Sequence, residues 1–307
     1  MRIVSLLPSG TEIAFALGLG DELCGVTFEC DHPPAARAVP VVSGTALPSD
    51  GSMSAAEIDA AVSARVAAGE SIYVLDTERI RAIDPDVILT QDLCQVCAVP
   101  TGAVEDALAV LGCHAEVVSL DPTRLDDVVS TIAQVGAATG RSSEASSLVA
   151  SLRARITAIE AAAGSALLAA GRPRVLLLEW GDPPFNAGHW MPDMVVAAGG
   201  QPVLAPLGGR SHRLTWHEVA AEVDGGGIDV VVFAPCGFDT EAAVAQGAGL
   251  LARPELDGVP EIWAVHADGY FSRPGPRVVD GTELLAAILH PDAVPDPPDP
   301  ELAVRLR

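Results

Sequence analysis

The stretch that decides the fold is residues 142–173, SSEASSLVASLRARITAIEAAAGSALLAAGRP. From Ala145 to Ala163 its apolar residues recur at the three- and four-residue spacing of a helix, and no strand-like run interrupts them. The pattern predicts one helix over 142–169, which at 1.5 Å per residue is about 40 Å long, the width of a domain. Gly171-Arg172-Pro173 ends it. We therefore expect a rigid strut between two lobes.

Runs rich in Val, Ile and Leu lie on both sides of this helix and alternate with helical patterns. Most are continuously apolar, as in strands buried on both faces of a parallel sheet. We expect an α/β fold of two Rossmann-like lobes with mostly parallel sheets: an N-terminal lobe over 1–141, the linker helix over 142–170, and a C-terminal lobe with a Pro-rich tail over 171–307. The predicted strands are Arg2–Leu7, Ile72–Leu75, Val87–Thr90, Glu116–Leu120, Arg174–Glu179, Asp229–Ala234 and Glu261–Val265. The other predicted helices are Thr11–Leu17, Ala55–Ala67, Val104–Leu111 and Leu125–Thr139.

The charge of the chain excludes several classes of function. Its 307 residues include 18 arginines, no lysine and 41 acidic residues, which gives a formal net charge of -23. Binding to nucleic acid or to an anionic membrane surface needs clustered basic residues, so we expect neither partner. The absence of lysine excludes Schiff-base enzymes, ordinary P-loop NTPases and protein kinases. We expect no membrane insertion, because no stretch approaches the roughly 20 apolar residues that a membrane helix needs.

The N-terminal residues bear on the cellular compartment of the protein. Met1–Pro8 form an apolar run that is too short for the core of a signal peptide and ends at a proline. Cys24 follows Asp21-Glu22-Leu23, which is not a lipoprotein cleavage sequence. We therefore expect a cytoplasmic protein from the sequence as it stands. A translational start further upstream would make it extracytoplasmic instead.

Polar, aromatic and sulfur-bearing residues concentrate directly after the predicted strands. Because ligands collect at the carboxyl ends of the strands in open parallel sheets, facing lobes would place these loops across one cleft. The candidate ligand-binding residues are Ser9, Gly10, Glu29, Cys30, Gln91 and Cys94 in the N-terminal lobe, and Trp180, Phe185, His189, Trp190, Phe238, Phe271 and Arg273 in the C-terminal lobe. Aromatic rings would supply contact area, and Gln91, His189 and Arg273 would orient the ligand.

Seven motifs occur in order along nearly the whole chain: Pro8-Ser9-Gly10-Thr11-Glu12, Ala16-Leu17-Gly18, Gly25-Val26, Asp31-His32-Pro33-Pro34, Asp84-Pro85-Asp86-Val87-Ile88, Pro183-Pro184-Phe185 and Ala198-Gly199-Gly200. Together they resemble the cobalamin and iron-siderophore solute-binding proteins of ABC importers, and in particular a leaderless, cobalamin-binding-like subgroup. The resemblance implies one long linker helix, a ligand cleft between rigid lobes, and surface carboxylates that dock onto an ABC permease. It also implies that an aromatic residue from the segment 270–277 faces the cleft. The chain departs from the cobalamin binders at Glu29 and Gln91, where those proteins carry aromatic residues.

Our main hypothesis is a solute-binding protein for a cobalamin-like or metal-chelate small molecule. It would not be an enzyme and would need no cofactor of its own, since neither a G-x-S-x-G elbow nor an H-E-x-x-H helix is present. The alternative is a cytosolic metal-binding protein or enzyme on the same scaffold. In that case Cys30, Cys94, Cys97, Cys236 and His189 would be the metal ligands. Cys94 and Cys97 are spaced as a redox pair as well, so free, bridged and metal-bound thiols all stay open.

Overall fold

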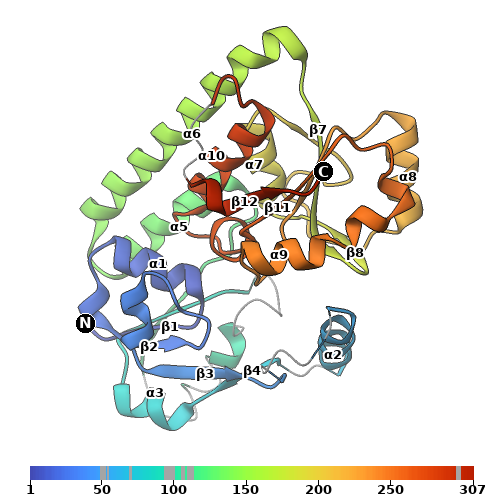
Figure 1. Ribbon diagram of the computed structural model, residues 1–307. Coiled ribbons are helices and arrows are strands. Elements are labelled where there is room, and N and C mark those ends of the chain that lie inside the picture. The colour runs from blue at the N-terminus through green and yellow to red at the C-terminus, as the bar shows by residue number, and fades with distance from the viewer. Residues whose placement is uncertain are drawn as a thin grey trace. The chain divides into compact units, whose positions relative to one another are not determined.

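The structure is a computed structural model that describes residues 1–48, 53, 55–68, 71–92, 101–104, 108, 114–294 and 299–307. The chain divides into two compact units. Unit 1 comprises Met1–Pro122 and Val129–Ala150, and unit 2 comprises Thr123–Val128 and Ser151–Arg307. Each unit contains one mostly parallel sheet with helices packed on it (Figure 1). The predicted α/β class with two mostly parallel sheets is therefore confirmed.

The sheet of unit 1 has the strand order β4-β3-β2-β1-β5-β6, and its pairs are parallel except for β3 with β4. The strands are β1 (Ile3–Ser5), β2 (Leu23–Thr27), β3 (Val41–Thr45), β4 (Tyr73–Leu75), β5 (Val87–Thr90) and β6 (Glu116–Ser119). Every residue of the central strands β1 and β5 is buried, as their continuous apolar runs predict. The sequence pattern missed β2 and β3, because Gly25 and Gly44 weaken their strand signal.

Among the residues that the structure describes, the helices α1 (Pro8–Ala16), α2 (Ala55–Ala67) and α3 (Thr77–Ile83) lie wholly within unit 1. The helix predicted over Val104–Leu111 lies largely outside the described residues. A cluster of buried side chains between the sheet and these elements forms the core. Its members are Val4, Leu6, Val42, Ile72, Tyr73, Ile80, Ile88, Val104 and Leu108.

Two helices belong partly to each unit. α5 (Leu125–Ala138) has its first turn in unit 2, and α6 (Ser142–Ala170) begins in unit 1 and ends in unit 2. The long helix predicted from the apolar spacing is thus present as α6. Near its middle, Arg155 donates hydrogen bonds to Asp280 and Glu283 of α10 (Val278–Leu289), at 2.5 to 2.9 Å. In the part of the chain that the structure describes, no helix combines the length and apolar character needed to cross a bilayer.

The sheet of unit 2 has the order β12-β11-β10-β7-β8, with the short β9 paired to β7. Its central strands β7, β10 and β11 are parallel to one another, and β8 and β12 are antiparallel additions. The strands are β7 (Arg174–Gly181), β8 (Pro184–Asn186), β9 (Gln201–Pro202), β10 (Val230–Phe233), β11 (Glu261–Val265) and β12 (Ala303–Arg305). The three central strands are the ones predicted from apolar runs.

The helices of unit 2 cover both faces of its sheet (Figure 1). α7 (Met191–Ala197) and α10 pack together on one face, and α8 (Trp216–Gly225) and α9 (Thr240–Gly247) lie on the other. α8 begins with a capping box, in which Thr215 and Glu218 each bind the backbone of the other. This layering leaves the carboxyl ends of β7, β10 and β11 at one edge of the sheet, where the loops with aromatic residues begin.

Candidate functional site

Two aromatic rings meet at the carboxyl ends of neighbouring strands in unit 2. Trp180 is the penultimate residue of β7, and Phe238 follows β10, which pairs with β7 in parallel. The ring centroids are 6.0 Å apart and the planes are nearly perpendicular, at 88°. This edge-to-face geometry is favourable for aromatic pairs, and both rings are only partly buried. The strand register therefore builds an accessible aromatic pair that the sequence predicted only as two separate residues.

Phe185 extends this aromatic edge. It lies in β8 and is paired across the antiparallel ladder with Trp180. The guanidinium of Arg213 lies over its ring, 5.5 Å from the centroid, which is a cation–π contact. A positive charge is thus held next to the aromatic surface.

His189 adjoins these residues in a constrained backbone conformation. Its φ of 55° lies in the left-handed region that residues other than glycine rarely adopt, and its N–H donates to the carbonyl of Gly209 at 2.5 Å. The imidazole Nε2 is buried and has no hydrogen-bond partner. Burial lowers the pKa of His189 below its ordinary value, and the positive charge of Arg210 lowers it further. At neutral pH the site therefore presents a neutral imidazole with an unsatisfied nitrogen.

The loop around His189 is closely packed against a second loop. A β-carbon on Gly188 would lie 2.1 Å from the backbone nitrogen of Ser211, so no side chain fits there. Residues 188–190 and 209–213 are consequently held together by their backbones. Arg210 and Arg213 come from the second of these segments and place two positive charges in this part of unit 2, although the whole chain is strongly acidic.

Three residues predicted to contact ligand lie inside unit 2. Trp190 is 5% exposed and its indole Nε1 donates to the carbonyl of Phe271 at 2.8 Å, while Phe271 is fully buried. Arg273 is 8% exposed and forms a two-pronged ion pair with Asp268, at 3.1 and 2.6 Å. These side chains support the loops from behind. The indole N–H of Trp190 and the charge of Arg273 are already bonded to other residues of unit 2.

In unit 1 the first two candidates lie in the buried face of α1. Ser9 is 2% exposed. A β-carbon on Gly10 would lie 2.9 Å from Leu7 Cδ2 and from Ser5 Oγ, and 3.2 Å from Leu89 Cβ. Gly10 therefore allows α1 to pack directly on β1 and β5. The structure gives this glycine a packing role.

The other described candidates of unit 1 are bonded to neighbours in the same unit. The hydroxyl of Tyr73 donates to Glu29 Oε2 at 3.2 Å. The thiol of Cys30 is 3.0 Å from the hydroxyl of Thr11. The amide nitrogen of Gln91, 4% exposed, donates to the carbonyl of Leu120 at 3.0 Å. Of these candidates, Glu29 alone is only partly buried.

The cysteine cluster considered for a metal is only partly visible. Cys94 and Cys97 lie outside the described residues. Cys30 is buried in unit 1, and Cys236 is an exposed residue that follows β10 in unit 2. Among the residues that the structure describes, no group of three or more His, Cys, Asp or Glu side chains is arranged to hold a metal ion.

Sequence reasoning missed two aromatic residues of unit 1. Phe28, directly after β2, is 40% exposed, and its ring centroid is 6.3 Å from that of Tyr73. Both lie beside Glu29, since Tyr73 binds its carboxylate. The position of Phe28 after a strand was the available signal, but β2 itself was not predicted. Tyr73 comes from a strand 44 positions further along the chain, and only the sheet topology brings it here.

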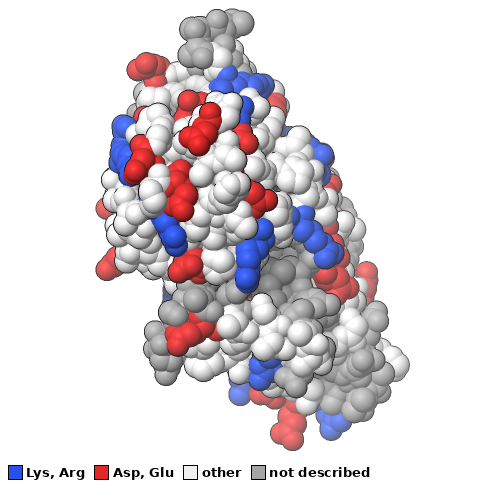
Figure 2. Space-filling model, turned by 90° about the vertical axis from the view of Figure 1, so that its right-hand side faces the viewer, with Lys and Arg blue, Asp and Glu red and all other residues white. Residues whose placement is uncertain are grey.

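The surface of the molecule carries both signs of charge. Figure 2 shows acidic side chains spread over one face with basic side chains between them. Some charged side chains of the molecule are paired, for example Arg153 with Asp126 at 2.8 Å and Arg305 with Glu261 at 3.3 Å.

Comparisons with known proteins agree on one kind of molecule. The sequence profile of a family described as "Periplasmic binding protein" matches residues 3–260. A vitamin B12-binding protein of Vibrio cholerae serotype O1 is 26% identical over 296 residues, covering 94% of this chain and 88% of the relative. The solved periplasmic vitamin B12 binding protein of Vibrio cholerae has a TM-score of 0.66 at 22% identity and covers 94% of this chain and 96% of its own. A periplasmic heme binding protein from Pseudomonas aeruginosa has a TM-score of 0.72 at 20% identity, covering 99% and 97%.

These matches overturn the expected location. The prediction of a cytoplasmic protein is wrong, because the matching family consists of periplasmic, extracytoplasmic binding proteins. The prediction relied on Met1–Pro8, and the structure shows why those residues were uninformative. They supply β1, which pairs with β2 and β5 in the middle of a sheet, and then enter α1. Residues that build the folded domain say nothing about the compartment.

Proposed function

Because this chain belongs to the periplasmic binding protein family, we propose that it captures a flat, metal-containing organic molecule of the cobalamin or metal-chelate class and delivers it to an ABC permease. Members of this family are solute-binding proteins. The chain would likewise bind and release its ligand without covalent chemistry. It would need no resident cofactor.

The observation that carries this proposal is the aromatic edge of unit 2. Trp180 and Phe238 are adjacent, partly exposed and placed at the carboxyl ends of parallel strands, where ligands of α/β sheets bind. Phe185 adds a third ring across the ladder. Large rings with open faces favour a flat or apolar ligand, because stacking and burial of apolar area both contribute.

Polar groups beside the rings indicate a ligand with a metal or with acidic substituents. The unsatisfied Nε2 of His189 costs about 1–3 kcal/mol while it lacks a partner, and a ligand group that bonds to it would recover that energy. A neutral imidazole is also a common metal ligand. Arg213, held over Phe185, offers a cation for a carboxylate or a phosphate. The relatives named above, a vitamin B12 binder and a heme binder, carry ligands of this class.

We retain Trp180, Phe185, His189 and Phe238 as the contacts of unit 2. Trp190, Phe271 and Arg273 would act behind them as supports, since their polar groups are bonded within the unit. Of the contacts expected from unit 1, Glu29 and Cys94 stay part of the proposal. Ser9, Gly10, Cys30 and Gln91 would instead support the fold of unit 1, since they are buried within it.

Titration of the purified protein with cyanocobalamin and, separately, with hemin tests the proposal. Absorbance of the ligand and quenching of tryptophan fluorescence would report binding. We expect one of the two to bind with a Kd in the micromolar range or below, and bound ligand to co-elute with the protein in gel filtration. If a folded sample binds neither at micromolar concentrations, the ligand class proposed here is wrong.

The proposal also covers how the protein would bind its ABC permease. Surface carboxylates would dock onto arginines of the permease, as the net charge of -23 favours. Binding of the loaded protein to permease in detergent should then weaken as salt rises from about 50 to 300 mM, because exposed charges are screened. Salt-independent binding would contradict this part of the proposal.

A further inference from the structure

The carboxylate of Asp193 in unit 2 accepts three hydrogen bonds from residues at the start of α5. Arg124 donates from Nε and Nη2 to both oxygens of Asp193, at 2.6 and 2.7 Å, and the backbone N–H of Leu125 donates to the same carboxylate at 3.2 Å. The side chain of Asp193 is only 11% exposed. We call this arrangement the Asp193 clamp, formed by Asp193, Arg124 and the N–H of Leu125.

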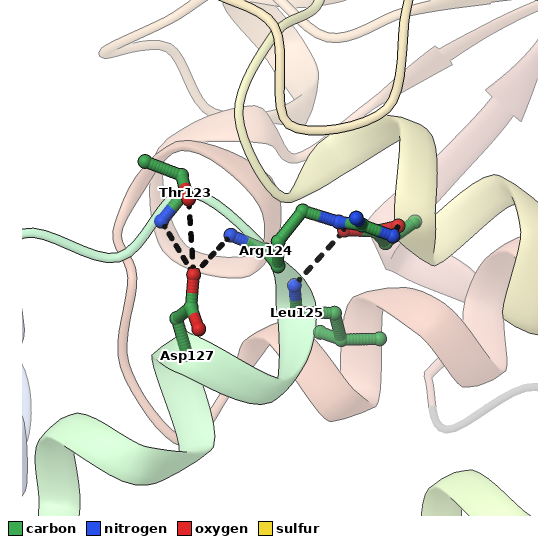
Figure 3. A network of polar contacts seen from close by, with 5 residues as sticks. Thr123, Arg124, Leu125 and Asp127 are labelled. Carbon is green, nitrogen blue, oxygen red and sulfur yellow. Dashed lines mark hydrogen bonds and ion pairs between the residues drawn. The ribbon is translucent and has the colours of Figure 1, made fainter.

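The carboxylate of Asp127, which belongs to the same turn, binds the start of the helix as well. Asp127 accepts hydrogen bonds from the N–H and the hydroxyl of Thr123 and from the N–H of Arg124, at 2.9 to 3.1 Å (Figure 3). Arg124 is thus held at its backbone by Asp127 and at its guanidinium by Asp193. Thr123–Val128, like Asp193, belong to unit 2.

The clamp lies next to the two segments that carry His189 and Arg213. Asp193 lies in the first turn of α7, which begins directly after His189 and Trp190. On the other side, a β-carbon on Gly208 would lie 2.8 Å from Arg124 Cδ, so the backbone of the second loop packs on the stem of this arginine. The next residue of that loop, Gly209, accepts the hydrogen bond from the N–H of His189.

From this geometry we propose that Asp193 and Arg124 are positioning residues of the ligand site, which hold residues 188–190 and 207–213 in their binding arrangement. This inference rests on the proposed function, because those segments supply His189 and Arg213. A rigid arrangement of the contacts before binding reduces the ordering that the ligand must impose, and loss of the clamp should therefore weaken binding mainly by faster dissociation.

The chain offers a matched control on the same helical turn. Arg153 donates to both oxygens of Asp126 at 2.8 and 2.9 Å, so this pair has the same two-pronged geometry as the clamp. The side chain of Asp126 is 70% exposed, however, and neither residue contacts the ligand loops in the bonds described above. The two arginines are equally exposed, at 48%, so the pairs differ in the burial of the carboxylate. Exposed ion pairs contribute little, whereas removal of Arg124 would leave the largely buried carboxylate of Asp193 uncompensated.

Hydrogen exchange measured by mass spectrometry tests the positioning role without a ligand. In Asp193→Asn, we expect faster exchange in peptides covering 123–128 and 207–213, with the strands of the unit 2 sheet unchanged. The Trp190 indole N–H should also shift in the NMR spectrum, because its loop leads into α7. Asp126→Asn should change neither. Equal exchange in the two variants would overturn the proposal. If Asp193→Asn does not fold, Arg124→Lys keeps the charge, loses the two-pronged geometry and serves in its place.

Ligand affinity gives the second readout, with whichever of cyanocobalamin or hemin binds the wild-type protein. We expect the Kd to rise about 10-fold in Asp193→Asn and in Arg124→Gln, less than about 2-fold in Asp126→Asn, and to recover partly in Asp193→Glu, which restores the charge. An unchanged Kd in a variant with loosened loops would overturn the positioning role. If neither probe binds the wild-type protein, the proposed ligand class fails, while the exchange experiment still decides whether the clamp orders the loops.

Discussion

The two units place similar residues at the ends of similar strands, yet they use them differently. In unit 1, Cys30 and Gln91 are bonded to Thr11 and to the carbonyl of Leu120, so their polar groups serve the fold. In unit 2, the rings of Trp180 and Phe238 stay partly exposed, and the imidazole of His189 has an unsatisfied nitrogen. The position of a residue after a strand therefore indicates a candidate, but the partners supplied by its own unit decide what it can still bind.

Among the described candidate residues, the side chains that are still open to a ligand therefore lie mostly in unit 2. The described part of unit 1 keeps one comparable feature, the exposed ring of Phe28 beside Glu29 and Tyr73. If the comparison holds, variants at the strand ends of unit 2 should change affinity, and variants at the buried candidates of unit 1 should change stability. The following experiments separate these two outcomes.

The largest effect is expected from the aromatic edge. Trp180→Ala should raise the Kd about 30-fold, equivalent to ~2 kcal/mol, since it removes a large ring that would stack on the ligand. Phe28→Ala should raise it less than about 3-fold, because that ring would contribute only at the margin. Isothermal titration calorimetry with the bound probe measures both. Trp263→Phe, a change in β11 away from the loops, controls for general loss of tryptophan. Equal losses from Trp180→Ala and Phe28→Ala would break the comparison.

A stability effect without an affinity effect is expected at Gly10. An alanine there would press on Leu7, Ser5 and Leu89, and overpacking of this kind destabilises by about 1–3 kcal/mol. Urea unfolding monitored by circular dichroism measures the change. Gly44→Ala is the matched control, because its β-carbon would meet nothing within 4 Å. A folded Gly10→Ala protein that keeps its stability but loses ligand would show that α1 belongs to the binding surface after all.

The smallest effect concerns the charge beside His189. Because the pKa of this imidazole is lowered from 6.5 in the folded protein, the unfolded chain binds the proton more tightly. Its contribution to stability is therefore complete above pH 6.5 and is lost as the pH falls through 6.5 toward the folded pKa. Arg210→Gln removes one of the two causes and should raise the pKa, which NMR titration of the ring protons measures. Arg213→Gln, whose charge lies over Phe185, should leave it in place. A lower pKa in Arg210→Gln would contradict the assigned cause.

Local pattern was enough to predict the parts of the fold that are strongly periodic or continuously apolar. α6 follows from helical spacing over nearly thirty positions, and β7 from the run Val175–Leu178, which is buried throughout. The sequence patterns did not predict the short strands β8 and β9, because PFN and QP contain proline and have too few residues to show a period. These strands form because the neighbouring strand supplies their backbone hydrogen-bond partners.

The candidate site was predictable as a set of strand ends but not as a set of contacts. Trp190 and Phe271 read like exposed rings in the sequence, yet one indole N–H bonded to one carbonyl, 81 positions away, places them in the interior. Arg124 and Asp193 gave no signal at all, since they lie 69 positions apart and are ordinary surface residue types. Which side chains face each other is set by tertiary packing, and single-sequence patterns do not contain it.

The close approach at Gly188 limits how this binding surface can diversify. Since a β-carbon there would lie 2.1 Å from the backbone of Ser211, all nineteen other amino acids are excluded unless the two loops separate. In a saturation library selected for function, position 188 should return only its wild-type codons, while the exposed position 210 tolerates many. New specificities would then evolve by exchanging side chains around an invariant backbone junction.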